Sequence, residues 1–328
     1  MKTELKPIAI TCGDPAGVGI EVAISAWKVL RDKIPLCLIG DPKFIPPETN
    51  FKIFDHPPKT KDLPKNSLAV MKHEFPESRE PGLPNPKNAL ATIEVIKKGV
   101  ELVKIKKFSA ICTMPISKSI LKCGANFSFP GHTEFLAHLD GNLNFAMMLV
   151  NKHLKVVPVT IHIPIKDITT YLSAELIEKK IKITHQELKN KFSISHPRIW
   201  IAGLNPHAGE NGTIGVEEQI FIIPIIKKLR SEGYNLRGPL SADTMFYQKK
   251  RGSFDAAICM YHDQALLPIK TLDFHSSVNL TAGLSFIRTS PDHGTAFDIA
   301  GKNLANPTST IEAIKLAWKL AKKDQRDR

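Results

Sequence analysis

A chain of 328 residues, of which 42% are hydrophobic and 23% charged, can bury the core of one large or two medium domains, which excludes a disordered protein. No run approaches the roughly 18 to 20 apolar residues of a membrane span, and the first ten residues lack a signal peptide's apolar core, so we expect a cytoplasmic protein without a membrane partner. The net charge of +13 does not indicate a nucleic-acid partner, because the lysines are spread along helix-like segments without interleaved aromatic residues.

Apolar strand patterns alternate with helical patterns along the whole chain. In chain order, we predict a strand at 7–12, a helix at 19–31, a strand at 36–40, an exposed loop at 76–88, a helix at 89–106, and strands at 109–113 and 156–163. A helix at 174–192, a strand at 198–203, a helix at 216–231 and a strand at 256–261 follow. Ser309 with Glu312 predicts a capping box for a last helix. This alternation is typical of an α/β fold, and we expect two lobes with a ligand cleft between them.

Three histidines stand at or just after predicted strands, namely His162, His207 and His262. Strand ends of an α/β protein converge on one rim, so these imidazoles could share a metal, although their long separations equally fit separately hydrogen-bonded histidines. Three neutral imidazoles with open coordination positions would be a catalytic site that favours zinc, with other divalent ions such as magnesium or cobalt left open. Asp243 and Asp263 are candidates to orient these histidines or to act as a base; the alternatives are a helix cap or a surface carboxylate.

Further polar positions suit an anionic ligand. The glycines of GDPAGVG could present N–H groups to an anion, but a tight strand-to-helix turn is the stronger interpretation. In PGHTEF, Thr133 could cap a helix and His132 could face a cleft. Lys270, Asn279 and Arg288 supply two cations and an amide that suit a phosphate or carboxylate, unless they are isolated surface residues. A late loop, TSPDHGTAFDIAGK, holds polar residues and glycines that packing does not obviously require: His293, Gly294, Asp298 and Gly301.

Taken together and in this order, GDPAGVG, PGHTEF, NPHAGE, GPLSADTMF, YHDQ and DHGTAFDIAGK resemble the 4-hydroxythreonine-4-phosphate dehydrogenases over essentially the whole chain. The resemblance implies a two-domain fold like that of the isocitrate and isopropylmalate dehydrogenases, with the active-site cleft between domains. It also implies a homodimer with the active site at the subunit interface. Residues 1–129 and 290–328 would form an outer α/β domain, and residues 130–289 a second one with the metal ligands and the dimer interface.

The resemblance also assigns the site residues. It gives the divalent metal to His162, His207 and His262, and the substrate to His132, Thr133, Lys270, Asn279 and Arg288. The adenosine end of a nicotinamide cofactor, NAD or NADP, would lie against the loop from His293 to Gly301, which includes Gly294 and Asp298.

The implied reaction is the oxidation of 4-phosphooxy-L-threonine at C3 to 2-amino-3-oxo-4-phosphooxybutanoate, with the metal stabilising the developing alkoxide. This β-keto acid decarboxylates to 3-amino-2-oxopropyl phosphate, a step of vitamin B6 biosynthesis. The proton acceptor stays open among Asp243, Asp263, Lys270 and His132. Also open are the choice between NAD and NADP, the metal used, and two alternatives: a sister dehydrogenase of a 4-phosphorylated threonate or erythronate, and a metal-dependent phosphatase.

Overall fold

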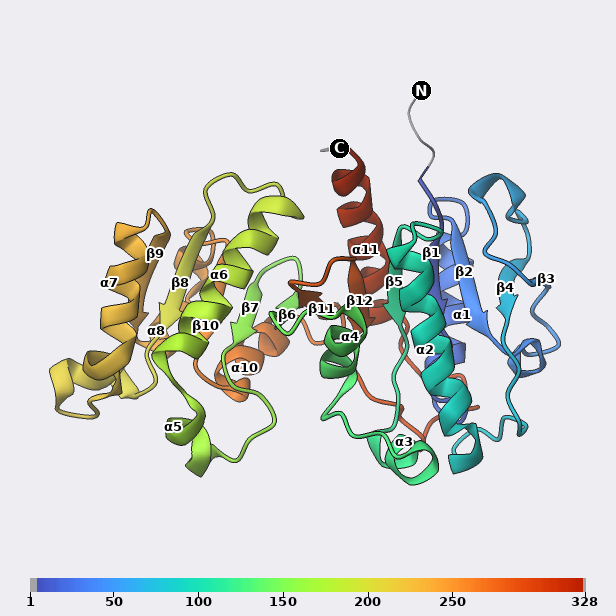
Figure 1. Ribbon diagram of the computed structural model, residues 1–328, viewed down its shortest axis with the longest axis horizontal. Coiled ribbons are helices and arrows are strands. Elements are labelled where there is room, and N and C mark those ends of the chain that lie inside the picture. The colour runs from blue at the N-terminus through green and yellow to red at the C-terminus, as the bar shows by residue number, and fades with distance from the viewer. Residues whose placement is uncertain (1–4, 327–328) are drawn as a thin grey trace. The chain divides into compact units, whose positions relative to one another are not determined.

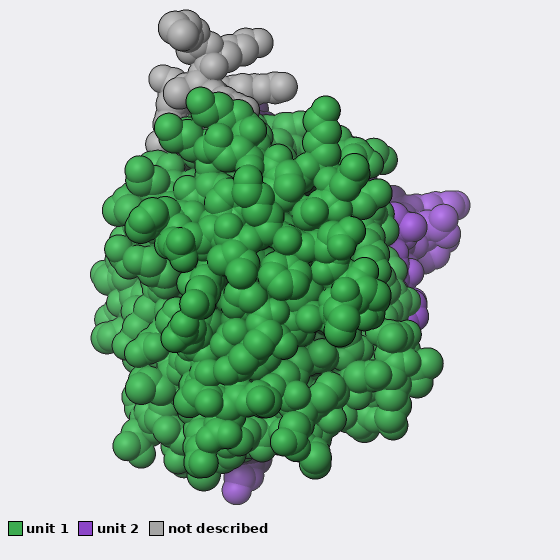
Figure 2. Space-filling model, turned by 90° about the vertical axis from the view of Figure 1, so that its right-hand side faces the viewer, with its two compact units in different colours: residues 1–143, 284–328 green, residues 144–283 purple. Residues whose placement is uncertain are grey.

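The computed structural model describes residues 5–326, and the chain divides into two compact units, which Figure 2 draws in separate colours. Unit 1 consists of Met1–Leu143 with Leu284–Arg328, and unit 2 of Asn144–Gly283. The division falls after Leu143 and Gly283, whereas the boundaries expected from sequence lie at 129/130 and 289/290. The PGHTEF segment therefore belongs to unit 1.

Unit 1 contains a sheet in which every neighbouring pair of strands is parallel, in the order β3-β4-β2-β1-β5-β12. Its central strands are buried along their whole length, as expected for a parallel sheet covered on both faces. The strands are β1 (Ile8–Thr11), β2 (Leu36–Gly40), β3 (Phe51–Phe54), β4 (Leu68–Lys72), β5 (Ala110–Thr113) and β12 (Arg288–Pro291). The strands predicted at 7–12, 36–40 and 109–113 are confirmed.

The α-helices of unit 1 (Figure 1) are α1 (Gly19–Leu30), α2 (Ala89–Lys104), α3 (Lys118–Ala125), α4 (His132–Asp140) and α11 (Thr308–Arg326). Helix α11 contacts β5, β12 and α1, and α2 contacts β1, β5, α3 and α4. The predicted capping box is wrong, because α11 begins at Thr308 and Ser309 lies inside it. The Ser309 hydroxyl instead accepts the backbone N–H of Asp292. Thr133 does not cap α4 either, since the N-cap is Gly131.

Unit 2 contains a mixed sheet in the order β11-β6-β7-β10-β8-β9. Pairs β11–β6 and β6–β7 are antiparallel, and the remaining pairs are parallel. The strands are β6 (Ala146–Val150), β7 (Lys155–Pro158), β8 (Arg198–Ala202), β9 (Asn235–Leu240), β10 (Ala256–Cys259) and β11 (Val278–Ala282). The helices are α5 (Ile168–Tyr171), α6 (Ala174–Asn190), α7 (Ile223–Ser231), α8 (Ala242–Met245), α9 (Gln248–Arg251) and α10 (His262–Leu272).

The helix predicted at 216–231 is in two parts, because a π-helical turn at Glu218–Ile222 precedes α7. Strands β7, β10 and β8 are adjacent and parallel, and their carboxyl ends lead into the segments of His162, His262 and His207, respectively. The expectation that each histidine lies at or just after a strand is therefore confirmed, although the strand predicted at 156–163 ends at Pro158. Within residues 5–326, no helix has the length and apolar content needed to cross a membrane.

Candidate active site

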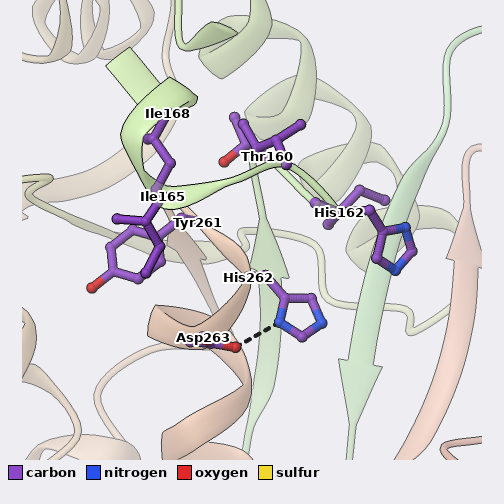
Figure 3. A pocket seen from close by; sticks show the side chains of 9 residues that line it. Thr160, His162, Ile165, Ile168, Tyr261, His262 and Asp263 are labelled. Carbon is purple, nitrogen blue, oxygen red and sulfur yellow. Dashed lines mark hydrogen bonds and ion pairs between the residues drawn. The ribbon is translucent and has the colours of Figure 1, made fainter. Parts of the chain in front are cut away.

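Two of the three predicted metal histidines line one cavity in unit 2. His162 and His262 share a cavity of about 150 Å³ with Thr160, Tyr261 and apolar residues of the 161–168 segment. Their ring centroids are 6.0 Å apart, and Figure 3 shows the rings side by side. A Zn–N bond is about 2 Å long, so two imidazoles on one ion have centroids roughly 5 to 6 Å apart. The two rings therefore fit a shared divalent ion.

The tautomer of His262 also suits a metal ligand. Its Nδ1 lies 2.7 Å from a carboxylate oxygen of Asp263, which Figure 3 places on the side of the ring away from His162. A carboxylate at Nδ1 holds the proton there and leaves Nε2 as the free electron-pair donor, the usual arrangement of a histidine that binds metal. Asp263 is thus placed to orient His262, one of the two roles expected for it.

The third histidine, His207, does not line this cavity. Its backbone is left-handed, with φ at 52°, as is that of His162, with φ at 55°. His207 lies near Asp243, whose pKa is lowered first by a hydrogen bond from the Ser241 hydroxyl and less strongly by His207. Among the residues the structure describes, no group of three histidine, cysteine or acidic side chains is arranged to hold a metal. The predicted triad is thus only partly assembled in this chain.

Unit 1 holds a buried cation, Arg288, with only 2% of its surface exposed. Its Nε and one terminal nitrogen both donate to the hydroxyl of Thr113, at 3.1 and 2.8 Å. Burial lowers the pKa of Arg288 from 12.5 to about 10, although Cys112 and Glu134 oppose this effect. The protein interior disfavours this charge, so an anionic ligand at the guanidinium would be strongly stabilised.

His132, the first residue of α4, lies near this cation. Its Nε2 is buried and has no hydrogen-bond partner in the described part of the chain. Burial, and then the charge of Arg288, hold the pKa of His132 well below its ordinary value of 6.5. The ring is therefore neutral at pH 7 and can donate or accept a hydrogen bond to a ligand. Thr133 follows it and is buried, so unit 1 brings together three of the five predicted substrate residues.

The other two predicted substrate residues belong to unit 2. Lys270 lies on α10, two turns after His262, and its Nζ stands 5.2 Å from the centre of the Phe274 ring. Asn279 lies on β11, and its side-chain oxygen is buried without a hydrogen-bond partner among residues 5–326. An unpaired buried amide oxygen is costly and is typical of a group that meets a ligand.

The predicted cofactor loop packs against the GDPAGVG turn. Thr295 of the loop accepts the N–H of Val18, and a Cβ at Gly17 would lie 2.8 Å from the same carbonyl oxygen. Gly17 therefore permits close backbone approach, which supports the turn interpretation of this motif. The Nδ1 of His293 lies 2.9 Å from the carbonyl oxygen of Gly294.

Open space and unpaired groups mark the same loop. Nothing lies within 4 Å of a Cβ built at Gly294, and the Nε2 of His293 is buried without a partner in the described chain. Asp298 is exposed, and the N–H of Gly301 donates to Glu21, which also pairs with Arg79 at 2.7 Å. Glu21 and Thr113 were not predicted as site residues, because their partners are far away in sequence.

Comparison with known proteins identifies the family of this chain. The family model described as pyridoxal phosphate biosynthetic protein PdxA matches residues 21–317. The 4-hydroxythreonine-4-phosphate dehydrogenase of Roseobacter denitrificans is 52% identical, over 98% of this chain and 99% of its own.

Two solved structures support the fold. The crystal structure of 4-hydroxythreonine-4-phosphate dehydrogenase from Klebsiella pneumoniae is 35% identical, with a TM-score of 0.87 over 96% of this chain and 99% of its own. Isocitrate dehydrogenase from Methylococcus capsulatus, at 12% identity and a TM-score of 0.50 over 98% of this chain and 88% of its own, shares the fold alone. The fold class and the resemblance predicted from the motifs are confirmed, and the chain belongs to the family of the pyridoxal phosphate biosynthetic protein PdxA.

Proposed function

We propose that this protein is an NAD- or NADP-dependent 4-hydroxythreonine-4-phosphate dehydrogenase that uses a divalent metal. It would oxidise 4-phosphooxy-L-threonine at C3 to 2-amino-3-oxo-4-phosphooxybutanoate, which loses carbon dioxide to give 3-amino-2-oxopropyl phosphate. The proposal is supported by the names of its relatives. The observation in this chain that carries it is the buried Arg288 beside a neutral His132, which suits a small anionic substrate.

The two units would contribute different parts of the chemistry. In unit 1, Arg288 would anchor the phosphate or the carboxylate of the substrate, and His132 would hydrogen-bond to it through its buried Nε2. In unit 2, the Lys270 ammonium and the Asn279 amide would bind further polar groups of the substrate. Contacts of this kind fix C3 for hydride transfer and convert binding energy into rate.

His162 and His262 would hold a divalent ion, since their spacing and the Asp263 contact suit one. We assign His207 to the same ion on the family resemblance. When bound, the ion would supply Lewis acidity at the C3 oxygen, and zinc is favoured by the imidazole ligands, with magnesium or cobalt as alternatives. The cofactor's adenosine end would lie against the 293–301 loop, where His293 offers an unpaired nitrogen and Gly294 leaves open space.

The contacts narrow the choice of proton acceptor. Asp263 is engaged by His262 and would orient that ring. Asp243 is kept ionised by the Ser241 hydroxyl and can accept a proton, so we favour Asp243 for taking the C3 hydroxyl proton and leave Lys270 to bind the substrate as an ammonium. We further propose a homodimer with the active site at the subunit interface, in which the partner could complete the ligand set. The expected cytoplasmic location stays a prediction.

The direct test is nicotinamide reduction by the purified protein with 4-phosphooxy-L-threonine, NAD or NADP, and zinc. A chelated sample and 4-phosphothreonate serve as controls. Metal-dependent reduction with release of carbon dioxide from the threonine compound is the expected result. Reduction with the sugar acid alone would transfer the proposal to the sister substrate, and release of phosphate without reduction would replace it with a phosphatase.

A further inference from the structure

The loop that carries His207 has a rare backbone conformation. Five consecutive residues, His207 to Asn211, have φ between 40° and 76°, and only one of them, Gly209, is a glycine. In this left-handed region the Cβ of an L-residue approaches the carbonyl oxygen, so a run of such residues persists only when its surroundings hold it. The groups that hold this loop also fix where the His207 imidazole can point.

A buried carboxylate, Glu218, supports the base of the loop. Glu218 is 1% exposed and begins the π-helical turn. Its Oε1 accepts the backbone N–H groups of Leu204 and Asn205 at 2.7 and 2.8 Å, and its Oε2 accepts the Asn205 side-chain amide at 2.9 Å. Three N–H donors on one carboxylate are charge-assisted and therefore strong.

The same carboxylate also touches the left-handed turn. A Cβ at Gly209 would lie 2.5 Å from Glu218 Oε2, and a Cβ at Gly203 would lie 3.0 Å from Oε1. Glu218 thus fills the inside of the loop, between its entry and its turn. A shorter side chain would leave the N–H groups of Leu204 and Asn205 without this acceptor.

A second buried side chain, Gln264, connects this loop to the other two histidine segments. Gln264 donates from Nε2 to the carbonyl oxygen of Gly203 at 2.8 Å and accepts the N–H of Met260 at 2.7 Å. The carbonyl oxygen of Met260 in turn accepts both the N–H and the hydroxyl of Thr160. Gly203, Met260 and Thr160 precede His207, His262 and His162 by four, two and two residues.

We infer that Glu218 and Gln264 are positioning residues for the three histidines: Glu218 holds the left-handed His207 turn, and Gln264 ties that loop to the starts of the His262 and His162 segments. This inference rests on the proposed metal role of the histidines. Supporting groups that orient metal ligands commonly change metal affinity by about 10- to 100-fold when removed. A merely structural role would lower stability and leave the zinc affinity of the folded protein unchanged.

The test measures zinc affinity of the full-length protein by competition with a chromophoric chelator, together with amide hydrogen exchange. We expect Glu218→Ala to weaken zinc binding about 10- to 100-fold and to speed exchange at Leu204 and Asn205. Glu218→Gln keeps an oxygen acceptor and should lose less affinity than the alanine variant. Gln264→Leu, of similar volume, should weaken zinc binding without speeding exchange at Asn205 to the same degree.

Glu187→Ala is the matched control. Glu187, on α6, is also a buried carboxylate of unit 2, at 4% exposure, but the N–H that it accepts is that of Gly283. This variant should lose stability and keep its zinc affinity within about two-fold. If both Glu218→Ala and Gln264→Leu bind zinc as tightly as the parent, the inference is overturned and the proposed function stands. If the parent protein itself binds no zinc, the metal part of the proposed function is overturned. If Glu218→Ala does not fold, Glu218→Gln and Gln264→Leu decide the matter.

Discussion

Replacing Arg288 with methionine separates a ligand-binding role of this buried cation from a structural one. Its surroundings lower the pKa of Arg288 from 12.5 to about 10, and a fall of about 2.5 corresponds to roughly 3 kcal/mol against the cation in the folded state. Methionine removes that cost but also loses the two hydrogen bonds to Thr113, worth about 1 kcal/mol each. We expect the free energy of unfolding to change by no more than about 2 kcal/mol.

Substrate binding should respond much more strongly to Arg288→Met. A buried, charge-assisted contact to phosphate or carboxylate is worth about 2 to 5 kcal/mol, which predicts a loss of affinity of roughly 30-fold or more. Calorimetric titration with 4-phosphooxy-L-threonine measures this loss, and urea unfolding measures the stability. Titration with unphosphorylated 4-hydroxy-L-threonine identifies the anion: if Arg288 binds the phosphate, the preference for the phosphorylated compound collapses in the variant.

Thr113→Val is the matched control, because it leaves the cation in place and removes only its hydroxyl partner. It should cost stability and keep most of the substrate affinity. A ligand-binding role of Arg288 is refuted if Arg288→Met is destabilised by more than about 3 kcal/mol while its affinity for the substrate equals that of the parent. Arg288 would then be a structural cation whose buried charge is compensated within the protein.

The burial of His132, the close approach at Gly17 and the contact of Asp263 with His262 can each be tested by one substitution. The pKa of His132 is held well below 6.5, so below about pH 6.5 the unfolded chain binds a proton at this position that the folded chain does not. The free energy of unfolding therefore falls with falling pH, by up to about 1.4 kcal/mol per pH unit. The urea midpoint of His132→Gln should fall less steeply with pH than that of the parent. Gly17→Ala places a Cβ 2.8 Å from the Thr295 carbonyl oxygen and should weaken NAD or NADP binding about 10-fold, as measured by fluorescence titration. The control Gly252→Ala has open space around its Cβ and should leave cofactor binding unchanged. Asp263→Asn should lower zinc affinity by about 10- to 100-fold in chelator competition, and an unchanged affinity would show that the contact to His262 does not orient a ligand.

Much of the fold could be predicted because buried parallel strands are continuous apolar runs. Strands β1, β2 and β5 were predicted within one residue at each end, and helices α1 and α2 within two residues. The errors occur where a distant residue decides the local structure. The Ser309 hydroxyl is taken by the N–H of Asp292, so no capping box forms, and the buried contacts of Glu218 lie at the start of the π-helical turn that sequence alone described as plain helix.

The candidate site was predictable to the extent that it depends on strand ends. His162, His207 and His262 follow three adjacent parallel strands, which agrees with the expectation from their sequence contexts. Their backbone was not predictable, because a positive φ, as at His162 and His207, is uncommon for any residue other than glycine and depends on tertiary contacts. For the same reason sequence reasoning could not find the acceptor roles of Glu218 and Gln264.

The strained histidines and the buried cation have a common physical basis. A left-handed backbone at His207 and a desolvated cation at Arg288 are both unfavourable in the free protein. A group that is unfavourable in the free protein and favourable in the complex makes binding more selective for a ligand with the matching charge, such as a phosphorylated substrate. Variants that relieve either cost should therefore be more stable without ligand and should gain less stability from substrate and metal than the parent does.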